Sequence, residues 1–95
     1  MNRLLLSARI VEASPLRLTP AGLEALDLRL EHESTLRQEG LMRQVSVQVA
    51  AVAFGAIARQ LAGQPLGAQG VFDGFLASRR AGKQLILQIQ NFQPH

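Results

Sequence analysis

The amino-acid sequence predicts an all-β protein with one short helix, built as a five-stranded barrel in the order β-β-β-α-β-β. Three observations predict this fold class. Apolar and polar residues alternate in five segments, which is the period of a half-buried strand. A sixth segment, residues 54–61, has the apolar spacing of a helix. Gly74 lies inside the fourth strand pattern, where a glycine marks a sharp bend or a bulge.

Three strands are expected before the helix, over residues 2–12, 26–33 and 42–52. The second and third alternate most clearly, through Leu26, Leu28 and Leu30 and through Val45, Val47 and Val49. Prolines and a glycine within residues 15–22 predict a turn between the first two strands. Residues 34–40 are largely polar, and we expect them to form the connection to the third strand.

The remaining elements are a helix and two strands. Four apolar residues form one helical face, namely Phe54, Ile57, Ala58 and Leu61. Gly63 and Pro65 are expected to end the helix. Strands follow at residues 68–78 and 84–92, and residues 79–83 form the hairpin loop between them.

This order of elements is the plan of the OB barrel, in which the face of the second and third strands and two loops bind oligonucleotides. The chain has 95 residues, so we expect residues 1–95 to form one domain. Leu5 and Val11 make the second face of the first strand partly apolar. An apolar strand at the edge of a sheet is a liability unless it is paired, so we also expect a homodimer.

Charge is unevenly distributed along the chain. Ten basic and seven acidic residues give a formal net charge of +3. Residues 24–42 carry five acidic and two basic side chains, whereas residues 43–95 carry one acidic and five basic. The acidic segment is either a solvated strand face or a surface that meets a basic protein partner. The basic segment is the better candidate for an anionic ligand.

No membrane association is predicted. Arg9 and Glu12 interrupt the apolar beginning of the chain before a signal-peptide core is complete. No other stretch approaches the roughly 20 apolar residues of a membrane span. We expect a soluble, cytoplasmic protein.

The chemistry of the side chains argues against an enzyme. The absence of cysteine excludes disulfides, thiol nucleophiles and Cys-ligated zinc. His32 lies between Glu31 and Glu33, but neighbouring residues of a strand point to opposite faces, so it cannot chelate a metal with either. Nothing orients Ser34 and His32 as nucleophile and base, and His95 is terminal. The glycines match no phosphate-binding loop, so we expect no cofactor, no metal and no catalytic residue.

The basic hairpin loop is the most function-like feature of the sequence. Arg79, Arg80 and Lys83 lie within five residues of one another, and an anionic ligand would relieve their mutual repulsion. The alternative is an exposed turn whose charge aids solubility. In an OB barrel this hairpin is one of the ligand-binding loops, which favours phosphate contact. Three further cations could extend the basic surface, namely Arg9, Arg17 and Arg43.

Aromatic residues are few, with four Phe and no Trp or Tyr. Phe54 and Phe72 are expected in the core, and Phe92 lies near the C-terminus. Phe75 has the opposite strand parity to Phe72 and is the candidate for stacking on a base. Stacking is worth about 1–3 kcal/mol per base in single-strand binders. Binding of a strand would therefore depend mainly on phosphate contacts.

Several segments resemble the family of primosomal replication protein N, also called PriB. The similar segments are residues 2–6, 19–22, 28–34, 38–44 and 72–76. The run Leu30-Glu31-His32 with Arg43-Gln44 downstream is fairly specific, whereas the glycine-containing fourth strand is shared with bacterial single-stranded DNA-binding proteins.

The resemblance implies an OB-fold homodimer that binds single-stranded DNA and docks on the restart helicase PriA, without enzymatic activity. It extends the expected partners to single-stranded DNA-binding protein and other primosome proteins. The basic loop carries over onto Arg79, Arg80 and Lys83. The family's aromatic residues do not, because Leu41 and Ser46 occupy those positions. Weak, strongly salt-dependent DNA binding is the resulting expectation.

Two alternatives remain open. The protein could be an interaction module whose acidic segment or barrel face serves a protein partner, with only incidental nucleic-acid binding. It could also be an RNA-binding or ribosome-associated OB domain, although the family resemblance argues against this.

Overall fold

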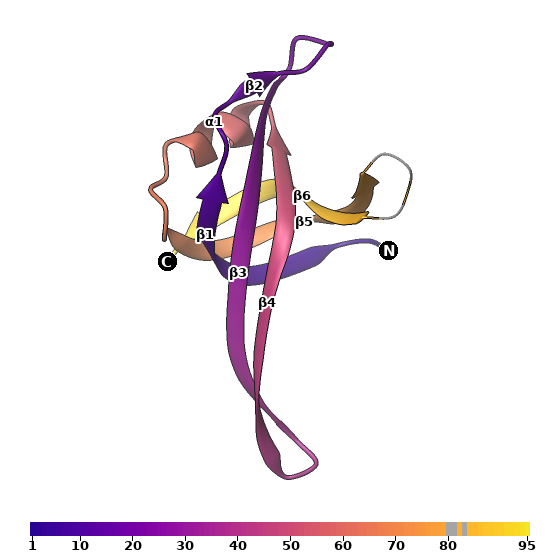
Figure 1. The fold of residues 1–95 in the computed structure, drawn as a ribbon, viewed down its shortest axis with the longest axis vertical. Helices are drawn as coiled ribbons and strands as arrows, with labels where there is room; N and C mark the ends of the chain where they lie inside the picture. The colour runs from indigo at the N-terminus through magenta and orange to yellow at the C-terminus, as the bar shows by residue number, and fades with distance from the viewer. Residues whose placement is uncertain (80–81, 83) are drawn as a thin grey trace.

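The computed structural model describes residues 1–79, 82 and 84–95 (Figure 1). It contains six strands and one helix within these residues: β1 (Leu4–Ala13), β2 (Arg17–Leu18), β3 (Glu24–Gln38), β4 (Leu41–Phe54), α1 (Ala56–Ala62), β5 (Gln69–Arg79) and β6 (Gln84–Pro94). The helix is too short to cross a membrane, and the described residues contain no other.

The five long strands close into a barrel. The sheet order is β1-β5-β6-β4-β3-β2, and β1 also pairs with β3, which completes the ring. All pairings are antiparallel except β4 with β6, which is parallel over three residue pairs. The all-β fold with one short helix and the five-stranded OB barrel are thereby confirmed. The two-residue strand β2, which pairs with the beginning of β3, was not expected within the first turn.

The core is formed by residues at alternate positions of every long strand. Ala8 and Ile10 of β1 are buried, whereas Leu5 on the opposite face is 58% exposed. Phe72 of β5 and Phe92 of β6 pack at a ring-centroid distance of 4.8 Å. Burial at these positions is the main favourable contribution to folding, at roughly 25 cal/mol per Å² of apolar surface.

Gly74 has the role that its position in the sequence predicts. The register between β5 and β6 shifts between Asp73 and Gly74, so the strand pair contains a bulge at this point. A Cβ atom on Gly74 would collide with the carbonyl oxygen of Gln88 in β6. Glycine therefore permits the close approach of two backbones where the barrel curves.

Helix α1 covers one end of the barrel (Figure 1). It begins after Gly55, which has φ 71°, and its last turn is followed by Gly63. Ala58 and Leu61 are buried against the strands. Phe54, which was expected on the helical stripe, is the last residue of β4 instead and is half-buried.

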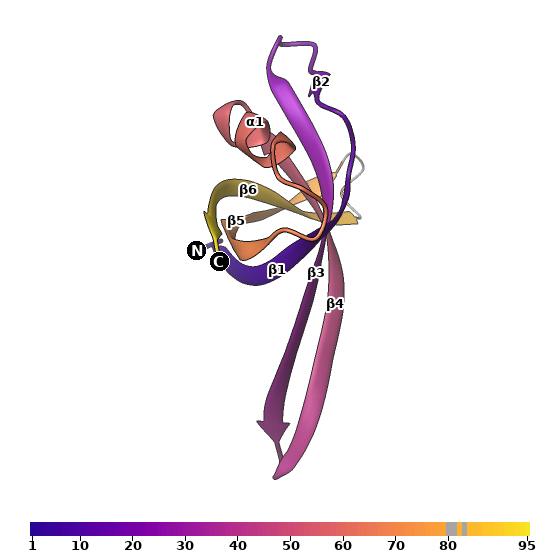
Figure 2. The ribbon, with the colours of Figure 1, turned by 90° about the vertical axis from the view of Figure 1, so that its left-hand side faces the viewer.

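Strands β3 and β4 continue beyond the barrel as a two-stranded arm, which Figures 1 and 2 show projecting away from the other elements. The expectation of a polar connection over residues 34–40 is therefore wrong. The strands pair continuously to Gln38 and Leu41, and the turn is only Glu39–Gly40, both with positive φ. The arm accounts for the elongated shape of the molecule, 51 × 31 × 22 Å.

Candidate nucleic-acid interface

Arg17 and Arg79 come from two different connections of the barrel and converge on one carboxylate. Arg17 lies in β2, between β1 and β3, and Arg79 is the last residue of β5. Figure 2 shows β2 and the adjoining ends of β5 and β6 on the side turned away from α1. Arg80 and Lys83 follow in the same hairpin and lie outside the described residues.

The shared carboxylate belongs to Asp27 of β3. Arg17 donates from Nε to Oδ2 at 2.8 Å and from Nη2 to Oδ1 at 3.2 Å, a bidentate pair. Arg79 Nη2 lies 3.6 Å from Oδ1 of the same carboxylate. The hydrogen bond and the charge of Arg17 lower the pKa of Asp27, against a smaller opposing effect of burial, and the same bond raises the pKa of Arg17. Two cations therefore share one anion.

A groove of about 360 Å³ opens beside this cluster. It is lined by Arg17, Asp27, Val52, Phe54, Ala77, Ser78, Arg79, Ile86 and Gln88. Apolar side chains from β4, β5 and β6 thus lie next to two guanidinium groups. Nucleic acids present flat apolar bases beside phosphates, and this arrangement is complementary to both parts.

Phe75 lies on the same face of β5 as Ala77 and Arg79, because alternate strand residues share a face. Its cross-strand partner is Gln88, which lines the groove. The ring is half-buried. Sequence reasoning selected Phe75 but not Phe54, whose position at the end of β4 was hidden by the expectation of an earlier helix.

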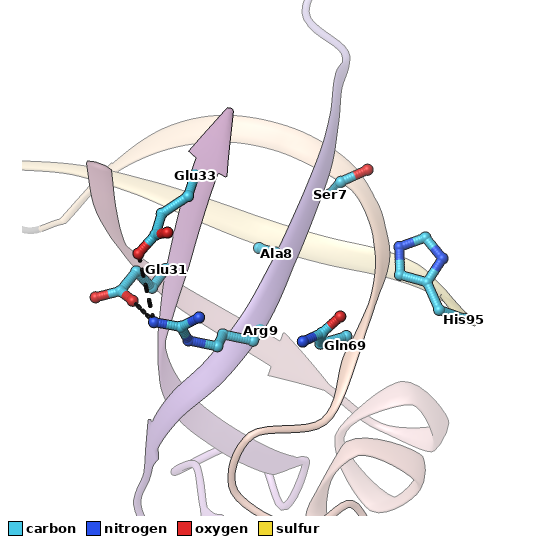
Figure 3. A pocket seen from close by; sticks show the side chains of 7 residues that line it. All are labelled: Ser7, Ala8, Arg9, Glu31, Glu33, Gln69 and His95. Carbon is cyan, nitrogen blue, oxygen red and sulfur yellow. Dashed lines mark hydrogen bonds and ion pairs between the residues drawn. The ribbon is translucent and has the colours of Figure 1, made fainter. Parts of the chain in front are cut away.

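Arg9 lies on another part of the outer surface, in β1, and points toward two glutamates of β3 (Figure 3). Its Nη2 donates to Glu31 and lies 3.5 Å from Glu33 Oε1. Gln48 of β4 donates to the second oxygen of Glu31 at 3.1 Å. This surface holds more negative than positive charge, so Arg9 has carboxylate partners that a phosphate would have to replace.

Arg43 lies in the arm, opposite Leu36 of β3, and donates to Gln38 Oε1 at 3.4 Å. Leu41 and Met42 beside it are 72% and 66% exposed. The structure therefore brings Arg17 and Arg79 together, and it places Arg9 and Arg43 at separate locations on β1 and the arm. These positions depend on the register of β3 against β2 and β4. No local pattern in the sequence reveals that register.

Comparison with known proteins decides the family. Residues 2–91 match the model of a family described as "Another single-strand binding protein family". The replication restart protein PriB of Bordetella pertussis is 49% identical over 80 residues, which cover 84% of this chain and 75% of that protein. The chain belongs to the PriB family.

Two further PriB proteins extend this likeness over the whole chain. That of Neisseria meningitidis is 35% identical over 98 residues, covering 99% of this chain and 94% of the relative. The solved structure of PriB from Ralstonia solanacearum superimposes with a TM-score of 0.89 at 32% identity, covering 100% of this chain and 98% of that one. The predicted family resemblance is confirmed.

His32, part of the motif that suggested the PriB family, holds two strands together. Its Nδ1 lies 2.6 Å from the carbonyl oxygen of Ser7 in β1, and its Nε2 lies 2.9 Å from Ser34 Oγ. Because a carbonyl only accepts, Nδ1 donates to Ser7, and in the neutral ring Nε2 accepts from the Ser34 hydroxyl. In the part of the chain that the structure describes, no cluster of metal-ligating side chains includes His32.

Proposed function

We propose that this PriB-family protein binds single-stranded DNA in replication restart. The single observation that supports this best is the groove in which Arg17 and Arg79 flank an apolar surface containing Phe54. These arginines belong to the two connections that bind oligonucleotides in OB barrels. Guanidinium groups match phosphate oxygens in bidentate geometry, and an aromatic ring accepts any base.

The proposed contact residues combine this groove with its neighbours in sequence. They are Arg79, Arg80, Lys83, Arg9, Arg17, Arg43 and Phe75. Arg17 and Arg79 are the first choice because they face one groove. Arg80 and Lys83 follow Arg79 in the same hairpin. Arg9 and Arg43 come last, since Arg9 lies beside two glutamates and Arg43 lies in the arm.

Titration of a fluorescently labelled dT oligonucleotide at low salt tests this function. Arg79→Ala with Arg80→Ala should weaken binding about tenfold or more, because two phosphate contacts are lost. A matched control is Arg3→Ala with Arg59→Ala, which removes the same charge from residues paired with Asp73 and Glu24. No binding by the unchanged protein, or equal losses in both double variants, would count against the proposal.

The proposed assembly is a homodimer formed through β1. Leu4 to Ala8 pair with β5, whereas strand pairing with β3 begins only at Arg9, so among the described residues the first half of β1 has one strand paired to it. Leu5 is exposed on this segment. Light scattering at micromolar concentration should give twice the chain mass, and Leu5→Glu should shift the mass to that of one chain. A monomer mass for the unchanged protein would contradict the dimer.

The proposed partner is a PriA-type helicase, with single-stranded DNA-binding protein and other primosome proteins as further candidates. The name of the relatives, replication restart protein, supports this partnership. Pull-down of purified helicase in nuclease-treated buffer separates docking from DNA binding. Helicase capture without DNA would support direct docking, and capture only when DNA is added would show that the strand alone connects the two proteins.

A second candidate function is that of a protein-interaction module. The surface of Arg9, Glu31 and Glu33 favours it, because this part of β1 and β3 is better suited to a basic protein partner than to phosphate. Retention of helicase docking by the Arg79 and Arg80 double variant, together with absent DNA binding by the unchanged protein, would favour this alternative.

A further inference from the structure

We infer that the groove beside Asp27 is a subsite for one nucleotide, in which a backbone phosphate replaces the Asp27 carboxylate between Arg17 and Arg79. Asp27 would then act as an internal competitor that limits the affinity for single-stranded DNA. The inference rests on the proposed function, and it assigns to Asp27 and Phe54 roles in that function.

The position of the phosphate is inferred from the geometry of the ion pair between Arg17 and Asp27. The two Asp27 oxygens accept from Nε and Nη2 of Arg17 at 2.8 and 3.2 Å, in the bidentate arrangement that a phosphate also adopts. Arg79 Nη2 is 3.6 Å from the same carboxylate, so it is close enough to bind an anion in that position but makes a looser contact. The carboxylate occupies the position in which a phosphate would bind.

The exposure of these side chains allows a phosphate to replace the Asp27 carboxylate. The side chains of Arg17 and Arg79 are 50% and 46% exposed, and that of Asp27 is 28% exposed. Displaced Asp27 can therefore be hydrated, and the guanidinium groups can reach a ligand from solvent. Burial would have prevented this, because an unpaired buried charge is strongly unfavourable.

The position of the base is inferred from the apolar part of the groove. Val52, Phe54, Ala77 and Ile86 line it, and Ser78 and Gln88 provide polar groups beside them. Its volume of about 360 Å³ is at the lower end of the range of small-molecule sites. A half-buried phenylalanine ring next to two arginines favours a base with its phosphate over an acidic peptide, whose carboxylates would need no aromatic surface.

The first experiment removes the competitor. Asp27→Asn should raise the affinity for a dT oligonucleotide at low salt by about threefold to tenfold, since an exposed ion pair of this kind no longer opposes binding. The matched control is Asp73→Asn. Asp73 forms the same bidentate pair with Arg3, at 3.2 and 3.1 Å, outside the groove. Unchanged or lower affinity of Asp27→Asn relative to Asp73→Asn would overturn the inference.

The second experiment tests the base. Phe54→Leu should weaken binding about fivefold or more, whereas Phe54→Tyr, which keeps the aromatic face, should bind like the unchanged protein. Equal affinities of all three proteins would overturn the assignment of the aromatic surface. Thermal melts of each variant check that the fold is kept.

A measurement on the unchanged protein avoids any effect of substitution on folding. The Nε–Hε resonances of Arg17 and Arg79 should shift when dT₅ is added, while that of Arg3 stays in place. An equal shift with an acidic peptide of the same charge would show general anion exchange and overturn the nucleotide assignment. If the unchanged protein fails to bind the oligonucleotide, the proposed function fails. If it binds and the Arg17 and Arg79 resonances do not move, this inference alone fails.

Discussion

Among the residues that the structure describes, Asp27 is the one carboxylate that contacts both Arg17 and Arg79. It accepts a bidentate pair of hydrogen bonds from Arg17 in β2 and lies close to Arg79 in β5. These contacts join two connections of the barrel to β3. They favour the ionised carboxylate, so its pKa lies below the usual value of an aspartate.

Acid titration should reveal this contribution in the free energy of unfolding. An aspartate whose pKa is lower in the folded state stabilises the fold above its unfolded pKa of 3.8, and this stabilisation is lost as pH falls through the folded value. Asp27→Asn should therefore flatten the decline of stability below pH 4. Urea unfolding between pH 2.5 and 6 measures it. An unchanged pH profile in Asp27→Asn would contradict the role of the ion pair.

Gly74 offers a second test at the scale of one residue. Gly74→Ala should lower the free energy of unfolding by about 1–3 kcal/mol, because the new methyl group would overlap the Gln88 backbone. Gly63→Ala is the control, since its Cβ would lie 3.5 Å from Gln60 O with no positive φ. Urea denaturation of both variants decides, and equal stability would refute the requirement for glycine at position 74.

Single residues show how far the sequence could predict the candidate site. Arg79 could be predicted as a site residue because it comes after a strand pattern and begins a glycine-containing loop. The proximity of Arg17 to it depends on Asp27 and on the pairing of β2 with β3, which are separated from β5 by many residues. Phe54 could be assigned to the groove only when the beginning of α1 was known. Long-range register therefore limits what a local pattern reveals.

At the scale of elements, the β3–β4 arm is the largest departure from expectation. Residues 35–38 and 41–44 of the arm are exposed on both faces, so apolar and polar positions do not alternate in these two stretches and the strand period is absent there. The alternation of apolar and polar residues that predicts a strand arises when one face of the strand is buried. A two-stranded ribbon outside the core lacks that signal, although its backbone pairing is continuous.

Shortening the arm should leave the barrel stable. Deletion of residues 35–38 and 41–44 would connect Ser34 and Val45 through the existing turn Glu39–Gly40 and keep the alternation of the register. No core residue is removed, so the free energy of unfolding should change by less than about 1 kcal/mol. Urea denaturation followed by circular dichroism measures this.

The comparison for the arm deletion is Leu30→Ala, which removes a fully buried side chain and should cost about 2–5 kcal/mol. If the deletion destabilises the protein as much as Leu30→Ala does, the arm is part of the cooperative core, and its description as an independent ribbon is wrong.

At the scale of the whole molecule, charge is organised by ion pairing more than by net excess. The chain carries only +3, and Arg3, Arg9, Arg17 and Arg59 each form an ion pair with a carboxylate. A diffuse positive surface is therefore a poor description of the molecule. In the sequence, the largest excess of positive charge is that of Arg79, Arg80 and Lys83, which lie within five residues of one another.

Salt dependence should reflect this concentration. If Arg17, Arg79, Arg80 and Lys83 contact three to four phosphates, the logarithm of the binding constant should fall with the logarithm of salt concentration with a slope of roughly −2 to −3. Oligonucleotide titrations at NaCl concentrations from about 20 to about 200 mM measure this slope. A slope near zero would show that phosphate contacts do not dominate binding.

The parallel pairing of β4 with β6 has a consequence for the time course of folding. β6 follows β5 in the chain but lies between β5 and β4, joined to β4 through Ala51–Leu87, Val52–Gln88 and Ala53–Ile89. The ring cannot close until residues 84–94 have been synthesised. Because its decisive contacts span long stretches of sequence, the chain belongs among proteins that fold in milliseconds to seconds. On the ribosome, the barrel would therefore complete its folding only after β6 has emerged from the exit tunnel.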